Sequence, residues 1–402
     1  MKLWKKLTLI FITLLLISQI PFAYRRYKLG RLNAAIQQAN SQRIITADNY
    51  VEYKGVMHVH SFLGGHSTGT FEEIIAAAKL NQLHFVIMTE HPSKNFSTAE
   101  KTLQGVFDGV LFVNGNEVST AQSDRLLVIP GNEGAPDADK KSTQEVITQA
   151  KGKSATVLVA YPDEFKGWDT PGYDGVEVYN VYTNARQINP VVMFFDGLWS
   201  YRSYPDLLFA TFYVRPVASL RHWDQAIATR KTRLVAVAGN DAHANVGLAL
   251  RDTSGKTLLG FKLDPYERSF RLVRLHLLLP SGGGLDTETL KTALAAGHCF
   301  IGFDLFSDST GFRFTGSNAN QTVIQGDEIT LGSGVRLDVV APIPSRIVLL
   351  RDGNSIQSES GATRKEFSIT EPGSYRVELY LPQLPGGVSE QPWIISNPIY
   401  VK

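Results

Sequence analysis

The chain of 402 residues is long enough for two domains, or for one large domain with an appendage. Its 43% hydrophobic and 19% charged residues exclude a disordered chain, and a formal net charge of +2 gives no sign of a nucleic-acid partner. The single cysteine, Cys299, excludes an internal disulfide and any cysteine-based zinc cluster, so metal ligands must be His, Asp or Glu.

The N-terminus predicts a membrane segment. Three lysines among the first six residues precede LTLIFITLLLISQIPFAY, residues 7–24, which carries no charge. About 18 such residues are the lower limit for a helix that spans a bilayer. The only candidate cleavage site, PFA, is poor, and basic residues follow at once. We therefore expect an uncleaved signal anchor over residues 1–28 and a polar, partly helical linker over residues 29–50.

The charges around this segment determine its orientation only weakly, because basic residues flank both ends. A soluble cytosolic enzyme has no use for such a segment. We therefore expect a membrane-anchored protein with its catalytic part on the extracytoplasmic side.

From Gly55 onward, short apolar runs alternate with helical patterns such as FEEIIAAAKLN, which Thr70 introduces. This alternation is typical of βα units around a parallel sheet. The strand-like runs are GVMHVH, HFVIMTEH, GVLFVNGNEVS, LLVIP, TVLVAYP, GVEVYN, LVAVAGNDAH, RLVRLHLLLP and HCFIGFD. About 250 residues of such units are the usual size of a closed (β/α) barrel, which we place at residues 51–315. An aromatic-rich, mostly helical stretch over residues 188–230 is expected to cap the barrel or line its mouth.

Residues 316–402 have a different pattern. The runs VRLDVVA, RIVLLRDG, KEFSIT and SYRVELYL are short alternating strands separated by Gly, Pro, Asn and Ser, with no helix between them. The pattern predicts a small C-terminal antiparallel β-sandwich, whose simplest role is a spacer or a brace against the barrel.

Metal-capable side chains stand where the predicted strands end. In the first strand, His58 and His60 are two residues apart, so an extended backbone would direct both imidazoles to one face. The later strand ends carry Glu90, His91, Glu117, Tyr161, Glu177, Asn180, Asp241 and His243. In a parallel barrel these ends open onto one face, where active sites lie. The sequence therefore predicts a metal site at this rim, whereas His276, within RLVRLHLLLP, is expected to be packed or paired on its strand.

The motifs HVHS, TEH, GNEVS and GNDAH, in this order, resemble the PHP (polymerase and histidinol phosphatase) family of metal-dependent phosphoesterases over residues 52–305. The phrases RHWDQAIA, GNDAHA, ALAAGHCFIGFD and PWIISNPIYV further resemble a subgroup that includes carbaryl-hydrolase-like proteins, in which a small β domain follows the barrel. The resemblance implies an α/β fold with a distorted (β/α)7 barrel and up to three divalent ions.

Carried over by matching motif, the resemblance implies that His58, His60 and Asp241 bind a first ion and that Glu117 bridges it to a second. His91 and His243 would serve a further ion or orient the substrate.

His66 lies near a place where the family often has Asp, so it is a further candidate ligand. Two positions depart from the family pattern. Asp124, followed by Arg125, stands where the family usually has His, and Tyr161 stands where it commonly has His before Pro. Asp124 can still coordinate a hard ion, whereas Tyr161 is a poorer ligand. These departures leave open a mononuclear site, a binuclear site or a degenerate one.

With only N and O ligands, the plausible metals are Mn, Zn and Fe, at one to three ions. Such a site generates a metal-bound hydroxide for hydrolysis, and His243 or His91 would carry the proton to the leaving group. The first hypothesis is a membrane-anchored phosphoesterase acting on a small phosphorylated molecule. Two alternatives remain: a metal-dependent ester, carbamate or amide hydrolase, and a non-catalytic surface binding protein with a degenerate metal site.

Overall fold

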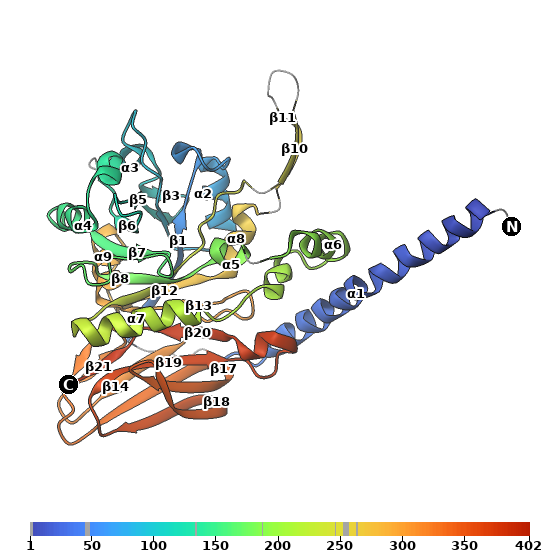
Figure 1. The fold of residues 1–402 in the computed structure, drawn as a ribbon. Helices are drawn as coiled ribbons and strands as arrows, with labels where there is room; N and C mark the ends of the chain where they lie inside the picture. The colour runs from blue at the N-terminus through green and yellow to red at the C-terminus, as the bar shows by residue number, and fades with distance from the viewer. Residues whose placement is uncertain are drawn as a thin grey trace.

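The computed structural model describes residues 3–44, 49–132, 135–186, 188–245, 247–251, 257–262 and 264–402. Figure 1 shows a mixed α/β body from which one long N-terminal helix projects.

That helix, α1 (Leu3–Asn40), runs without a break through the predicted anchor and into the predicted linker. Its 38 residues correspond to a length of about 57 Å. The first half is exposed and is long and apolar enough to cross a membrane. Near its end, Leu29, Leu32 and Ile36 are buried in the core of the body. The first part of residues 29–50 is therefore helix packed against the body.

The remaining elements alternate along the chain. The helices of the body are α2 (Phe71–Leu80), α3 (Thr98–Lys101), α4 (Thr143–Lys151), α5 (Val181–Ala185), α6 (Pro190–Ser200), α7 (Val217–Arg230), α8 (Tyr266–Leu272) and α9 (Thr287–Ala296). The strands before α9 are β1 (Tyr50–Val59), β2 (Phe85–Met88), β3 (Gly105–Phe107), β4 (Val110–Val113), β5 (Asn116–Ser119), β6 (Arg125–Ile129), β7 (Thr156–Ala160), β8 (Gly175–Asn180), β9 (Val235–Gly239), β10 (Gly247–Arg251), β11 (Thr257–Lys262) and β12 (Arg274–Pro280). The later strands are β13 (Cys299–Gly302), β14 (Arg313–Ser317), β15 (Thr322–Ile324), β16 (Glu328–Ile329), β17 (Val335–Arg351), β18 (Asn354–Ile369), β19 (Gly373–Tyr380), β20 (Pro392–Ser396) and β21 (Ile399–Val401).

Local sequence explains where several helices begin. Thr70 caps α2, at the start that the sequence pattern predicted, and it exchanges hydrogen bonds with Glu73. Ser142 and Glu145 form the same capping box at α4. Such boxes satisfy backbone N–H groups that the first helical turn leaves free. Within residues 188–230, α6 and α7 confirm the expected helical character.

A closed (β/α)7 barrel is not confirmed. Within the described residues the strands form a sheet in the order β5-β6-β7-β8-β9, a larger sheet that contains β12-β1-β2-β4-β3, and the hairpin β10-β11. In the part of the chain that the structure describes, two isolated parallel bridges, Val59 with Ala242 and Glu90 with Asn116, connect the first two sheets.

The pairing is also mixed rather than parallel throughout. The pairs β1–β2, β2–β4, β7–β8 and β8–β9 are parallel, but β5–β6 and β6–β7 are antiparallel. The reason lies in the short connection between Ser119 and Arg125, because a parallel crossover needs a dozen or more residues. The hairpin brings the start of β6 to the rim where β5 ends.

The larger sheet continues across the predicted domain boundary. Its full order is β15-β14-β17-β19-β20-β13-β12-β1-β2-β4-β3, and β13 pairs with β20 through Phe300 with Ser396 and Ile301 with Ile395. The strand β14 itself straddles residue 315. The C-terminal strands are largely antiparallel, as the sequence predicted, but backbone pairing joins them to the body. The boundary at residue 315 stays a prediction.

A buried ionic cluster lies where β1, β12 and the segment after β13 meet. His276 on β12 is fully buried, with Nδ1 2.7 Å from Oε1 of Glu52 and Nε2 3.2 Å from Oδ2 of Asp304. Burial alone would lower the pKa of His276, but the two carboxylates raise it to about 9. The same contacts hold the pKa values of Glu52 and Asp304 below their usual range. The folded protein therefore favours the protonated, positively charged form of His276.

This cluster predicts a loss of stability at alkaline pH. Because the pKa of His276 rises from 6.5 unfolded to about 9 folded, its contribution is complete below pH 6.5 and disappears as the pH passes 9. We expect urea unfolding of the full chain in detergent to lose about 3 kcal/mol between those values. At pH 6.5 the variant His276→Gln should have a lower free energy of unfolding than the native chain. That free energy should then change less as the pH rises. An equal loss of stability with rising pH in the native chain and the variant would contradict the role assigned to the protonated His276.

Candidate metal centre

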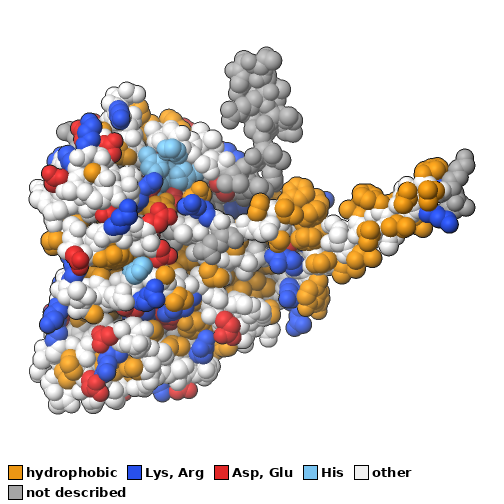
Figure 2. All heavy atoms as spheres, in the orientation of Figure 1, with side chains coloured by type: hydrophobic (Ala, Val, Ile, Leu, Met, Phe, Trp, Pro, Cys, Tyr) orange, Lys and Arg blue, Asp and Glu red, His pale blue; other side chains and the backbone are white. Residues whose placement is uncertain are grey.

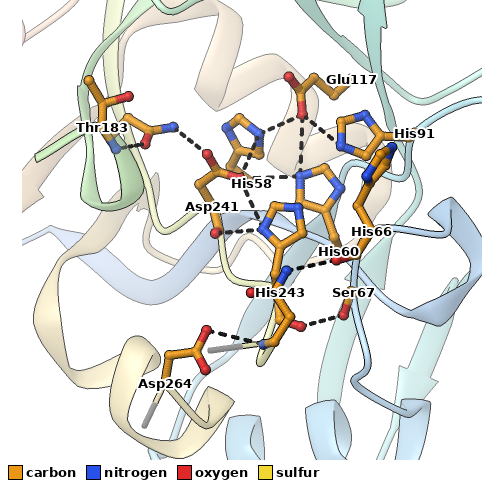
Figure 3. A network of polar contacts seen from close by, with 12 residues as sticks. His58, His60, His66, Ser67, His91, Glu117, Thr183, Asp241, His243 and Asp264 are labelled. Atoms are coloured by element: carbon orange, nitrogen blue, oxygen red, sulfur yellow. Dashed lines mark hydrogen bonds and ion pairs between the residues drawn. The ribbon is translucent and has the colours of Figure 1, made fainter. Parts of the chain in front are cut away.

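Two buried histidines and two buried carboxylates meet where β1 and β9 end and β5 begins. These residues, His58, His60, Glu117 and Asp241, each offer one ligand atom, and the four atoms lie within 4.8 Å of one another. The Nε2 atoms of His58 and His60 are 3.1 and 3.4 Å from Oε2 of Glu117, and both are 3.5 Å from Oδ1 of Asp241. Figure 3 shows the imidazoles gathered around the two carboxylates.

A second group shares His60 and opens toward solvent. It consists of His60, His91 and His243, whose ligand atoms also lie within 4.8 Å of one another. The ring of His60 stacks between the other two, with centroids 4.6 Å from His91 and 4.2 Å from His243. The side chains of His91 and His243 are 19% and 14% exposed, so they form the accessible edge of the site.

Several buried polar atoms in the centre lack a hydrogen-bond partner. Within the described residues, neither ring nitrogen of His60 nor Oδ1 of Asp241 has a hydrogen-bond partner, although both side chains are buried. A buried polar atom without a partner costs about 1–3 kcal/mol. Nitrogen and carboxylate oxygen in this arrangement suit a divalent cation such as Zn²⁺, Mn²⁺ or Fe²⁺. The donor set therefore fits a metal ion.

Hydrogen bonds from outside the centre hold one oxygen of each carboxylate and leave the other oxygen free. Oδ2 of Asp241 accepts from the hydroxyl of Tyr161 at 2.6 Å and from Nδ2 of Asn180 at 3.2 Å, which leaves Oδ1 directed at the histidines. Oε1 of Glu117 accepts from Arg125 at 2.6 Å, which leaves Oε2 for the same purpose. The protein thus orients one oxygen of each carboxylate into the centre.

Glu177 holds His58 in place from behind. Its Oε1 lies 2.6 Å from Nδ1 of His58, so that Nε2 faces the centre. Such carboxylate–histidine pairs fix the ring orientation and tautomer of metal ligands. Gly239 makes room for the pair, because a Cβ there would lie 1.7 Å from Oε1 of Glu177. A side chain at this position is incompatible with the arrangement.

The backbone at the rim is irregular, which corrects one step of the sequence argument. His58 has φ of 60°, and Tyr161 and Asp241 have φ of 50° and 46°. The register between β1 and β2 shifts beside His58, and His60 lies beyond the end of β1. The two histidines therefore converge through a bulge rather than by simple alternation along a strand. Left-handed backbone at non-glycine residues costs about 1–3 kcal/mol each and persists only where surrounding contacts enforce it.

The charges of the centre set its protonation. Burial alone would raise the pKa values of Glu117 and Asp241, but the neighbouring histidines lower both, that of Glu117 to about 2. Burial lowers the pKa of His60 to about 3. Burial would also lower the pKa of His58, but the charges of Glu177 and Asp241 raise it well above its usual value. Three of the four ligands are thus in the ionisation state that a metal requires, and metal binding releases the proton of His58.

Two predicted ligands lie outside both groups. His66 is exposed at the rim, with its ring centroid 4.9 Å from that of His91. Asp124 is buried, but its carboxylate accepts from the hydroxyl of Thr143 at 2.6 Å and from the backbone N–H of Lys166 at 2.7 Å. The structure therefore brings together six of the eight predicted side chains, namely His58, His60, His91, Glu117, Asp241 and His243.

Sequence reasoning did not predict which residues orient the ligands. Tyr161, Glu177 and Asn180 stood among the predicted strand ends, so their place at the rim was visible in the sequence. Their pairing with particular ligands was not, because it depends on side-chain directions at irregular backbone. Arg125 reaches Glu117 only because β5 and β6 form a hairpin.

No family model matches the sequence, and no curated protein matches it. Among solved structures the chain is similar to PsfC from Pseudomonas syringae PB-5123, with 12% identity and a TM-score of 0.37 over 64% of this chain and 93% of that chain. A similarity this distant indicates neither the fold nor the function. What the centre does must be argued from its own geometry.

Replacing Asp241 by Asn should abolish tight metal binding. The change keeps the shape of the side chain but removes the charge that both central histidines face, so we expect the apparent Kd for Zn²⁺ to rise at least about 100-fold. Titration against a chelating dye measures it. The matched control is Asp108→Asn, at an exposed carboxylate paired with Lys79, which should bind as the native chain does. Equal affinity in the two variants would exclude the centre as the metal site.

Replacing Glu177 by Gln tests the outer contact alone. The amide fits the same space but no longer holds Nδ1 of His58 with a charge, so metal affinity should fall about 10–100-fold while the fold is retained. Glu164→Gln, at a side chain 69% exposed, serves as the control for the chemical change. Unchanged affinity in Glu177→Gln would mean that the pair with His58 has no part in binding.

Proposed function

We propose that the protein is a membrane-anchored, metal-dependent hydrolase of the PHP type, and that its substrates are phosphoesters. The observation that supports this most is the buried centre in which Nε2 of His60 and Oδ1 of Asp241 have no hydrogen-bond partner among the described residues and lie within 4.8 Å of ligand atoms from His58 and Glu117. One to three ions of Zn, Mn or Fe fit the two groups, which share His60.

The PHP assignment also concerns the fold. We propose that the two sheets are the halves of a distorted barrel, supported by the parallel bridges of Val59 with Ala242 and of Glu90 with Asn116 at the rim. The centre lies between these bridges, and its ligands come from both sheets.

When bound, a divalent ion lowers the pKa of a coordinated water to about 7 and polarises the phosphoryl oxygen. The residues of the chain would do the rest. His58, His60, Glu117 and Asp241 would hold the ion, and their burial would exclude bulk water from it.

His91 and His243, at the exposed edge, would carry a proton to the leaving group, because a ring nitrogen of imidazole can accept a proton and give it up again. Arg125 is 40% exposed, so its guanidinium is accessible to a substrate anion beside Glu117.

The anchor is α1, which would retain the catalytic part at the extracytoplasmic face of the membrane. The length and the exposed apolar surface of its first half support this. The substrate would be a small molecule rather than a nucleic acid, since the chain has 40 basic and 38 acidic residues.

A non-catalytic binding protein is the second candidate. It is favoured by Asp124, which lies outside both ligand groups, and by Tyr161, which bonds to Asp241 where the family commonly has a histidine. Both features reduce the number of ligands relative to the family pattern.

Activity of the full chain in detergent should decide between these functions. With Mn²⁺, Zn²⁺ or Fe²⁺ we expect hydrolysis of p-nitrophenyl phosphate or bis-p-nitrophenyl phosphate. We expect His243→Asn to lower kcat about 100-fold or more while the four-residue centre keeps its metal. The control His222→Asn changes a histidine that lies next to Asp163 and Trp168.

Three outcomes would contradict or redirect the proposal. Turnover of aryl esters or carbamates, but of no phosphoester, would show that the enzyme hydrolyses ester or carbamate bonds rather than phosphoesters. Bound metal without any turnover would favour the binding protein. A chain that binds less than one ion would also favour the binding protein, because that candidate has a degenerate metal site.

A further inference from the structure

The helix α6 exposes an apolar stripe. Val191, Phe194 and Leu198 are 63%, 66% and 70% exposed. Their spacing of three and four residues places them on one face of the helix. A helix normally buries such a face against another surface. Figure 2 shows exposed apolar surface where α6 lies, beside the exposed apolar surface of α1.

The opposite side of α6 is fixed to α1. The rings of Phe22 and Phe195 have centroids 4.9 Å apart. Nε of Arg25 donates to the carboxylate of Asp196 at 2.7 and 2.9 Å, and Asp196 is buried. A second arginine of α1, Arg26, donates to the hydroxyl of Ser203 just beyond α6 at 3.0 Å. The two helices therefore form one unit.

These contacts lie at one level of α1. Nε1 of Trp199 donates to Gln19 at 3.0 Å, so the contact region on α1 extends from Gln19 to Arg26. In the sequence, the apolar run ends at Tyr24, and basic residues follow. About 20 residues of helix fill the hydrocarbon core of a bilayer, so this level corresponds to the boundary between acyl chains and headgroups. Trp and Tyr are enriched at that boundary.

A basic groove adjoins the same level. It is lined by Ala23, Arg26, Tyr27, Gly30, Arg31, Ala34 and Tyr204. Cationic side chains beside the end of a membrane segment attract anionic lipid headgroups. The surface around α6 thus presents apolar side chains next to positive charge, the combination found in helices that lie in a membrane interface.

We propose that α6 is such an interfacial helix and that its Val191, Phe194 and Leu198 face lies in the bilayer beside α1. The occupant is lipid rather than a second copy of the chain, because the stripe continues the apolar surface that α1 presents to the membrane. The inference rests on the membrane anchoring proposed above. It adds a second attachment, and because α5 and a short connection link Asn180 of the metal centre to α6, it also fixes how the centre is oriented over the membrane.

Single labelled cysteines test the docking in the full chain. The native Cys299 is fully buried, so a reagent for exposed thiols should label only an introduced cysteine. The variants are Leu198→Cys and Phe194→Cys on α6, Leu14→Cys on α1 and Val106→Cys on β3, where the native side chain is 68% exposed. Each carries an environment-sensitive fluorophore in nanodiscs of phosphatidylcholine and phosphatidylglycerol, prepared with and without brominated acyl chains.

We expect brominated lipid to quench the labels at positions 14, 194 and 198 severalfold more than the label at position 106. Quenching at 14 but not at 194 or 198 would overturn the interfacial helix while leaving the anchor intact. No quenching at 14 would show that the anchor itself fails. A blue-shifted emission at 194 and 198 without quenching would mean that another copy of the chain covers the stripe, and would also overturn the proposal.

Discussion

The candidate metal centre depends on the two buried carboxylates of Asp241 and Glu117. Hydrogen bonds hold one oxygen of each carboxylate, and the other oxygen points into the centre. Tyr161 and Asn180 hold Oδ2 of Asp241, and Arg125 holds Oε1 of Glu117. Burying two carboxylates is unfavourable unless positive charge compensates them. In the protein alone, Arg125 supplies positive charge beside Glu117, and the protonated His58 supplies more. Burial would lower the pKa of His58, but the charges of Glu177 and Asp241 raise it. A metal ion can take the same place, and the orphaned atoms of His60 and Asp241 gain partners when it does.

The position of the candidate ligands could be predicted because the end of an apolar strand is visible in a sequence. That rule placed His58, Glu117 and Asp241 at one rim. The family resemblance added Asp124, which lies in the turn between β5 and β6 but bonds to Thr143 and the N–H of Lys166 instead of joining the ligand groups. Strand order could not be predicted either, because the pairing of β13 with β20 joins segments nearly a hundred residues apart that share no local pattern.

The N-terminal helix α1 is more than an appendage to the body. Its C-terminal turns pack Leu29, Leu32 and Ile36 into the core, and its middle pairs with α6. The apolar run was evident from composition, whereas the continuation of the helix to Asn40 depends on tertiary packing that the polar sequence after residue 28 does not reveal. The N-terminal helix is therefore packed against the same body that carries the candidate metal centre.

The most direct test of the central claim is an anomalous diffraction map from crystals of the full chain grown with Zn²⁺ or Mn²⁺. The account predicts a peak within about 2.0–2.2 Å of Nε2 of His58 and His60 and of Oδ1 of Asp241, with Oε2 of Glu117 beside it. A protein with bound metal elsewhere, or with no peak among these four side chains, would contradict it.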